Sequence, residues 1–420
     1  MPMGYVVNVV LAAACTALAL YPPLRPRPLA RAAFVLGVGF SELPHVAAVL
    51  LLGVTALTLS ELGDPGRLGA GAAAVLALAA VTLAGLTVLA RRAVRARAAV
   101  RDALAGAGTP VPGADALPAT SAWTRSDRRW ALTSALTPLP WRPRTVERIA
   151  DLRYGEHRRH RLDVYRRRGG PVGGPVLVYF HGGGYTSGGK HREARALLHR
   201  LAQRGWVCVS ATYRLRPEAG FADHLGDAHR VLEWTQCHAA AYGGDPSTLV
   251  MAGSSAGAHL TALCALAPGR AADSASPGAP AVASPGAPTA PTAPTAPTAP
   301  PRIAAAVCLY GYYGRYYGAD RDGAPPSTPL ALDAAGAPPF FLVHGDRDSY
   351  VPVDGARAFA AALRSRSAQP VVLAELPGGQ HGFDVVSSWR MRAVLDALEV
   401  FLVDPRVGVV RPAGVLDAGG

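Results

Sequence analysis

The chain has 420 residues, half of them hydrophobic, and a formal net charge of +13 at pH 7. This length predicts more than one structural unit. The positive charge invites a nucleic-acid-binding role, but the sequence contains no motif of that class, and many arginines flank apolar segments instead, so we expect no nucleic-acid partner. The 5 cysteines are widely spaced and form no CxxC pair, which argues against a disulfide framework or a zinc site and agrees with a cytoplasmic setting.

Three apolar segments lie within the first 101 residues. They are residues 5–21, 32–59 and 68–90. A helix of about 20 apolar residues crosses the hydrocarbon core of a bilayer, so we predict a transmembrane region with about three helices at residues 1–101. The first segment lacks a basic region before it and is followed by further apolar segments, which favours an uncleaved anchor over a signal peptide.

Arginines are distributed unevenly around these segments. The loop between the second and third segments carries two acidic residues and only Arg67. The other two flanking regions are basic, with Arg25, Arg27 and Arg31 before the second segment and Arg91, Arg92, Arg95, Arg97 and Arg101 at and after the end of the third. The positive-inside rule places both basic regions in the cytoplasm, so we expect everything after residue 101 to face the cytoplasm.

The second segment contains two ionisable residues, Glu42 and His45. Such residues at membrane depth are often functional. The alternative is that the stretch Ser41–Pro44 breaks the segment, leaving a short interfacial helix and then a span over about residues 45–60. We favour the break, because the other spans carry no companion charges that would build a transport path.

Residues 102–143 read as a linker in which tryptophans alternate with arginines, among them Trp123, Arg125, Trp130 and Trp141. This pattern fits an interfacial segment on anionic lipid. It fits equally well a segment that covers the following domain.

From residue 144 to residue 404 short β-branched runs alternate with helical patterns, which predicts one α/β domain: a doubly wound, mostly parallel sheet with helices on both faces. The expected strands are residues 146–152, 161–165, 175–180, 206–213, 248–252, 303–310, 339–343 and 371–376, and the expected helices are residues 191–203, 223–241, 256–266, 354–366 and 387–402. An Ala-Pro-Thr repeat within residues 268–302 predicts a disordered insertion, and residues 405–420 predict a flexible tail.

The strongest chemical motif is Gly253-Ser-Ser255-Ala-Gly257, a G-x-S-x-G sequence that directly follows a β-strand pattern and directly precedes a helical one. A sharp strand-to-helix turn of this kind exposes the hydroxyl of its central serine, and the helix N-terminus beneath it favours negative charge. Taken alone, the motif also fits an ordinary glycine turn, so the prediction that Ser255 is a nucleophile depends on finding its partners.

Partners of the right types follow other predicted strands. His181-Gly-Gly183-Gly184 has backbone N–H groups that can approach a carbonyl oxygen, and no Lys-Ser/Thr follows at the spacing of a phosphate-binding loop. Two carboxylates, Asp346 and Asp348, follow the strand at 339–343, and His381 follows the strand at 371–376. The order Ser, Asp, His along the chain is that of one particular hydrolase fold.

Together these motifs resemble the α/β-hydrolase esterases and lipases, in particular the hormone-sensitive-lipase-like and feruloyl-esterase-like groups. The resemblance implies that Ser255 is the nucleophile, His381 the general base and Asp348 its orienter. It also implies that the backbone N–H groups of Gly183, Gly184 and Ala256 form the oxyanion hole. One departure is Ser254, because hormone-sensitive-lipase-like enzymes usually carry an acidic residue there.

We therefore expect a membrane-anchored serine hydrolase that cleaves carboxylic esters through an acyl-enzyme, without a metal or an organic cofactor. The anchor makes lipid-like esters candidate substrates. One alternative is amide or peptide hydrolysis, since the string around Ser255 also resembles kynurenine formamidases and prenylcysteine methylesterases. A second is a catalytically inactive membrane scaffold, against which the complete set of catalytic residue types argues.

Overall fold

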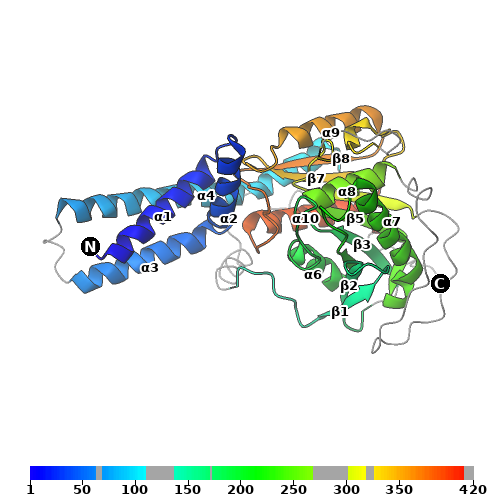
Figure 1. The fold of residues 1–420 in the computed structure, drawn as a ribbon, viewed down its shortest axis with the longest axis horizontal. Coiled ribbons are helices and arrows are strands. Elements are labelled where there is room, and N and C mark those ends of the chain that lie inside the picture. The colour runs from blue at the N-terminus through cyan, green and yellow to red at the C-terminus, as the bar shows by residue number, and fades with distance from the viewer. Residues whose placement is uncertain (63–68, 110–136, 171–172, 268–300, 318–325, 411–420) are drawn as a thin grey trace, which may run out of the picture.

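The computed structural model describes residues 1–62, 69–109, 137–170, 173–267, 301–317 and 326–410. Long helices occupy one end of the molecule and a sheet flanked by helices occupies the other (Figure 1). The predicted Trp/Arg sequence between Trp123 and Trp130, most of the predicted insertion and the last ten residues of the predicted tail lie outside the described residues.

One sheet of eight strands forms the centre of the second part, in the order β1-β2-β4-β3-β5-β6-β7-β8. The strands are β1 (Val146–Arg153), β2 (Arg161–Arg167), β3 (Gly174–Phe180), β4 (Val207–Ala211), β5 (Gly244–Ser254), β6 (Ile303–Leu309), β7 (Phe340–Gly345) and β8 (Val371–Leu376). Among the strand pairs of the described residues, β1/β2 and β2/β4 are antiparallel. The remaining pairs are parallel, which confirms the predicted mostly parallel α/β sheet.

Both faces of the sheet are buried. Along β3, Val178 and Phe180 belong to one hydrophobic cluster and Leu177 and Tyr179 to another, as expected when successive side chains point to opposite faces. The first cluster is closed by α7 (Phe221–His238), α8 (Ala256–Leu266) and α9 (Asp354–Arg366). The second is closed by α6 (Arg195–Gln203) and α10 (Trp389–Val403). A three-layer domain follows, with the carboxyl ends of β3 and β5 to β8 at one edge.

The described residues of the N-terminal part form four helices. They are α1 (Met3–Leu20), α2 (Arg27–Glu42), α3 (Pro44–Leu62) and α4 (Ala70–Gly106). Of these, α1, α3 and α4 are long and apolar enough to cross a membrane. Small residues allow close packing between them: a Cβ on Gly85 of α4 would lie 2.8 Å from Thr16 Cγ2 of α1.

The favoured break of the second apolar segment is confirmed, because α2 ends at Glu42 and α3 begins at Pro44, within Ser41–Pro44. A predicted helix boundary in the third segment was wrong. The third segment does not end at residue 90 and the linker does not begin at 102, because α4 continues to Gly106.

The extension of α4 has a tertiary cause. With 37 residues and about 1.5 Å of rise for each, α4 is about 55 Å long, whereas the hydrocarbon core of a bilayer is about 30 Å thick. Beyond the apolar part, Ala96, Val100 and Leu104 form one buried stripe that joins the cluster under α10. The buried Val407 and Val409 join the same cluster, so the start of the predicted tail is also packed. The helical region is thus packed directly against the sheet domain.

Candidate active site

The turn that carries Ser255 has the geometry its motif predicts. Ser255 lies between β5 and α8 with φ 53° and ψ −114°, a conformation that non-glycine residues rarely adopt. Only glycines fit beside it. A Cβ on Gly253 would lie 2.2 Å from the Gly257 carbonyl carbon, and a Cβ on Gly257 would lie 2.0 Å from the Phe180 carbonyl oxygen of β3. The strained turn is therefore held between neighbouring parallel strands.

The structure brings Ser255, His381 and Asp348 together at the carboxyl edge of the sheet. Ser255 Oγ lies 3.0 Å from His381 Nε2, and His381 Nδ1 lies 2.7 Å from Asp348 Oδ2. These side chains follow β5, β8 and β7, respectively, and parallel strands place their carboxyl ends at one edge. The three residues are separated by up to 126 positions in sequence, so the sheet topology creates the contact.

Asp348 is held firmly. Its Oδ1 accepts hydrogen bonds from the backbone N–H groups of Tyr350 at 2.9 Å and Val351 at 2.7 Å. A second histidine, His344, places Nε2 3.2 Å from Asp348 Oδ2. Burial raises the pKa of the Asp348 carboxyl, but the charge and hydrogen bonds of His381 and His344 outweigh this and hold its pKa at about 2. Asp348 is thus a fixed carboxylate.

The other candidate acid, Asp346, takes a different role. Its Oδ1 accepts a hydrogen bond of 2.6 Å from the backbone N–H of Gly378, in the loop before His381. It therefore ties two loops together, while Asp348 faces the histidine.

The predicted oxyanion-hole residues belong to two segments that adjoin Ser255, the glycine turn after β3 and the start of α8. Gly182 lies so close that a Cβ there would be 3.0 Å from Ser255 Cβ, and its N–H donates to Glu193 Oε2 at 2.5 Å. Within the described part of the chain, the N–H groups of Gly183 and Gly184 donate to no other residue. Ala256 is the first residue of α8, where N–H groups have no partner within the helix. Three backbone donors thus lie in the two segments that adjoin the serine.

Beneath the turn lies a buried polar network that the sequence did not reveal. Asp384 Oδ2 accepts hydrogen bonds from Ser254 Oγ at 2.8 Å and from the Ala194 N–H at 3.1 Å. Its Oδ1 accepts one from the Tyr310 hydroxyl. Burial and the charge of Glu193 raise the pKa of Asp384 to about 7, although these donors favour the ionised form. Asp384, which is 130 residues from Ser254 in sequence, thus contacts the residue at which hormone-sensitive-lipase-like enzymes usually carry an acidic side chain.

Aromatic rings surround His381. The Tyr310 ring centroid lies 4.5 Å from that of His381, Tyr350 lies 5.1 Å away, and Phe34 of α2 lies 5.6 Å away with its plane nearly perpendicular. The motifs in the sequence did not predict these three aromatic neighbours of His381. No local motif marks Phe34, since it lies in the segment predicted to be an anchor.

Two histidines outside the triad have structural partners. His181 stacks on Tyr213 with ring centroids 4.4 Å apart, and burial lowers its pKa to about 4. His259 Nδ1 lies 2.7 Å from the Tyr185 hydroxyl, and its Nε2 lies 2.8 Å from the Ser327 carbonyl oxygen. Neither ring contacts Ser255 through a hydrogen bond. In the described ranges, no group of three or more His, Cys, Asp or Glu side chains is arranged to hold a metal ion.

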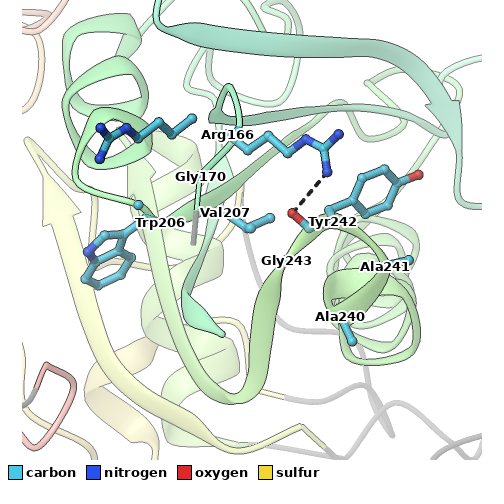
Figure 2. A pocket seen from close by; sticks show the side chains of 11 residues that line it. Arg166, Gly170, Trp206, Val207, Ala240, Ala241, Tyr242 and Gly243 are labelled. Carbon is cyan, nitrogen blue, oxygen red and sulfur yellow. Dashed lines mark hydrogen bonds between the residues drawn. The ribbon is translucent and has the colours of Figure 1, made fainter. Parts of the chain in front are cut away.

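Two hollows lie at opposite edges of the sheet. One of about 270 Å³ is bordered by Arg166, Trp206 and Gly243 and lies where β4 and β5 begin, away from the triad (Figure 2). The other, of about 260 Å³, is lined by Tyr312, Tyr313 and Val351 among others and lies at the carboxyl edge, next to the Asp348 loop.

Comparison with known proteins identifies the family of the chain. Residues 177–385 match the family described as alpha/beta hydrolase fold. The probable carboxylic ester hydrolase LipM of Mycobacterium tuberculosis is 34% identical, over 90% of this chain and 89% of that protein. The esterase LipQ of the same organism is 35% identical over 65% of this chain and 67% of that protein, and its esterase LipC is 31% identical over 59% and 63%.

The chain therefore belongs to the α/β-hydrolase family, within its hormone-sensitive-lipase-like esterases. It is a carboxylic ester hydrolase of the serine type. The predicted family and enzyme class are confirmed.

Proposed function

We propose that the protein is a membrane-anchored carboxylesterase whose catalytic residues are Ser255, His381 and Asp348. The observation that carries this proposal is the unbroken series of contacts from Ser255 Oγ to His381 Nε2 and from His381 Nδ1 to Asp348 Oδ2. A serine hydroxyl is a weak nucleophile until an adjacent base accepts its proton, and this arrangement supplies such a base with a fixed orientation.

The reaction has two halves. In the first, Ser255 Oγ attacks the ester carbonyl carbon while its proton passes to His381 Nε2, and the resulting imidazolium then gives that proton to the departing alcohol. In the second, water attacks the acyl-enzyme with His381 again taking a proton, and the carboxylic acid leaves as Ser255 regains its own. Asp348 stays ionised throughout, as its low pKa allows, and stabilises the imidazolium.

Negative charge develops on the substrate oxygen in both halves. The N–H groups of Gly183, Gly184 and Ala256 are the donors available to it. Because they belong to a fixed turn and to a helix N-terminus, they need no rearrangement when the charge appears. Gly183 and Gly184 have φ of 111° and 58°, so glycine is required to present these groups in this way.

Anchoring rests on α1, α3 and α4, which are long and apolar enough to cross a bilayer. Helix α2 lies at the junction between the long helices and the sheet domain (Figure 1), and Arg25, Arg27 and Arg31 lie at or just before its beginning. Arg92, which follows the apolar part of α4, donates to the Leu20 carbonyl oxygen at the end of α1, next to the same connection. By the positive-inside rule the hydrolase domain lies in the cytoplasm. A reporter that works only in the cytoplasm should therefore be active when it is fused to the C-terminus. Activity of a fused reporter that works only in the periplasm or outside the cell would contradict this orientation.

The catalytic assignment is tested with purified protein and p-nitrophenyl esters of increasing acyl length, beside a matched anilide. Ser255→Ala should lower kcat by about 10⁴-fold or more, because it removes the nucleophile. Ser365→Ala, an exposed position on α9, is the matched control and should leave the rate unchanged. Full turnover by Ser255→Ala would overturn the assignment, and cleavage of the anilide in preference to every ester would favour the amidase alternative.

A further inference from the structure

Helix α2 is fastened to the loops that carry the catalytic histidine and aspartate. Near its beginning, the Ala30 carbonyl oxygen accepts a hydrogen bond of 2.9 Å from Ser349 Oγ, next to Asp348. At its end, Ser41 Oγ donates to the Gly378 carbonyl oxygen at 3.0 Å, in the loop that leads to His381. An anchor that only tethers a domain needs no such contacts.

A buried ion pair strengthens the second attachment. Glu42 Oε1 lies 3.1 Å from Arg390 Nη1 of α10, and both side chains are fully buried. The same guanidinium nitrogen donates to the Ser41 carbonyl oxygen at 2.7 Å, and Nη2 of Arg390 donates to the Pro377 carbonyl oxygen at 2.9 Å. Separated buried charges are costly, so the pair fixes α2 relative to the catalytic loops.

Between these attachments, α2 contributes a side chain to the catalytic site. The Phe34 ring meets the His381 ring edge to face and lies 5.7 Å from the Tyr350 ring. Phe34 also lies next to Gly382, beside Val385. Tyr350 and Val385 are 46% and 37% exposed, so this apolar rim is open to the surroundings.

The position of α2 relates this rim to the membrane. Helix α2 follows α1 after six residues and precedes α3 after only Leu43, so it lies where two candidate spans end. Figure 1 shows it at the junction between the long helices and the sheet domain. It therefore occupies the level of the bilayer surface on the side of the hydrolase domain.

The exposed side chains of α2 fit that level. Leu29, Val35 and Leu36 are exposed, and so are Arg25, Arg27 and Arg31 at and just before its beginning. An amphipathic helix with arginines at one end and exposed aliphatic side chains is suited to anionic head groups and to the acyl region just below them. The occupant that matches both features is the lipid bilayer.

We propose that α2 forms one wall of the substrate site and that Ser255 receives esters directly from the bilayer. The substrate class is an amphiphilic ester whose acyl chains remain in the membrane, with its ester group at head-group level. Phe34 and the rim formed by Tyr350 and Val385 contact the chain as the ester group approaches Ser255. This inference rests on the proposed function and specifies its substrate.

The direct test uses the full-length protein reconstituted into vesicles of phosphatidylcholine and phosphatidylglycerol in equal parts. A fluorogenic two-chain ester is placed either in the enzyme's own vesicles or in separate vesicles, between which it exchanges slowly. Hydrolysis should be at least about tenfold faster in the first arrangement, because each buried methylene opposes passage through water. Soluble p-nitrophenyl butyrate measures the basal esterase.

The outcomes separate the two proposals. Hydrolysis of butyrate without hydrolysis of the two-chain ester, or with equal rates in both arrangements, overturns entry from the bilayer and leaves the esterase proposal intact. Failure to hydrolyse any ester overturns the esterase proposal itself.

Phe34 is tested against Phe40, a residue of the same type on the same helix that packs on the spanning helices. Phe34→Ala should lower the rate for the two-chain ester relative to butyrate by about tenfold, the order expected for a lost apolar contact in a substrate pocket. Phe40→Ala should leave this ratio within about twofold of wild type. Equal ratios in the two variants would overturn the role of Phe34, and labelling by a fluorophosphonate confirms that each variant is folded.

Discussion

Replacing Asp348 by asparagine tests the electrostatics of the site with almost no change in shape. Asp348 Oδ1 accepts two backbone N–H groups, from Tyr350 and Val351, so an asparagine keeps its carbonyl oxygen there. Its NH₂ group then takes the place of Oδ2 and faces His381 Nδ1. Two donors cannot pair, so His381 must present a bare Nδ1 and carry its proton on Nε2, where it can no longer accept the proton of Ser255.

The expected loss follows from this change of tautomer and from the loss of the charge that stabilises the imidazolium. Such a change costs about 10⁴-fold in kcat, or about 5.5 kcal/mol of transition-state stabilisation. The assay is kcat for p-nitrophenyl butyrate, with thermal unfolding to confirm the fold.

The matched control is Asp346→Asn, two residues away, whose carboxylate faces Gly378 and not the histidine. We expect its kcat to fall less than about threefold, since it removes no contact of His381. An Asp348→Asn enzyme within tenfold of wild type, or an equal loss in both variants, would refute the reasoning.

Two predictions concern stability. Glu42→Ala leaves the Arg390 charge buried and unpaired and should lower the free energy of unfolding by about 3 to 5 kcal/mol, measured by thermal unfolding in detergent. The control is Glu61→Ala, which removes an exposed carboxylate on α3. Equal effects of the two substitutions would contradict the role of the ion pair. Asp384 has a raised folded-state pKa, so the folded protein binds more protons than the unfolded chain between pH 4 and about 7 and loses stability as pH rises through that range. Asp384→Asn should flatten this dependence of melting temperature on pH, and an unchanged slope would contradict the assignment.

Local patterns predicted much of the sheet domain. All eight expected strands are present within a few residues of their predicted ends, because β-branched runs bounded by glycine and proline are marked by short-range preferences. The positions of Ser255, Asp348 and His381 after strands also predicted a shared edge, since parallel neighbours align their carboxyl ends. The choice between Asp346 and Asp348 rested on family resemblance, and the fold of their loop decides which carboxylate faces the histidine.

The helical region shows where local patterns fail. The predicted end of the third span at residue 90 followed the loss of apolar residues, but α4 continues because Ala96, Val100 and Leu104 are buried against α10 and the sheet. Glu42 appeared as a lone charge in an apolar segment, and its partner Arg390 is 348 residues away. The residues around Glu42 or around the end of the apolar part of α4 do not indicate that a distant element will bury them.

By itself, the sequence determined the class of protein: an α/β hydrolase with a serine in a strained turn, preceded by apolar helices. Periodicity and glycine-rich turns are local, and the physical forces behind them act over a few residues. Only the tertiary structure decided that Asp384 contacts the turn below Ser255 and that Phe34 of α2 lies against His381. These contacts join segments that are 130 and more than 300 residues apart, and they depend on packing that no local pattern encodes.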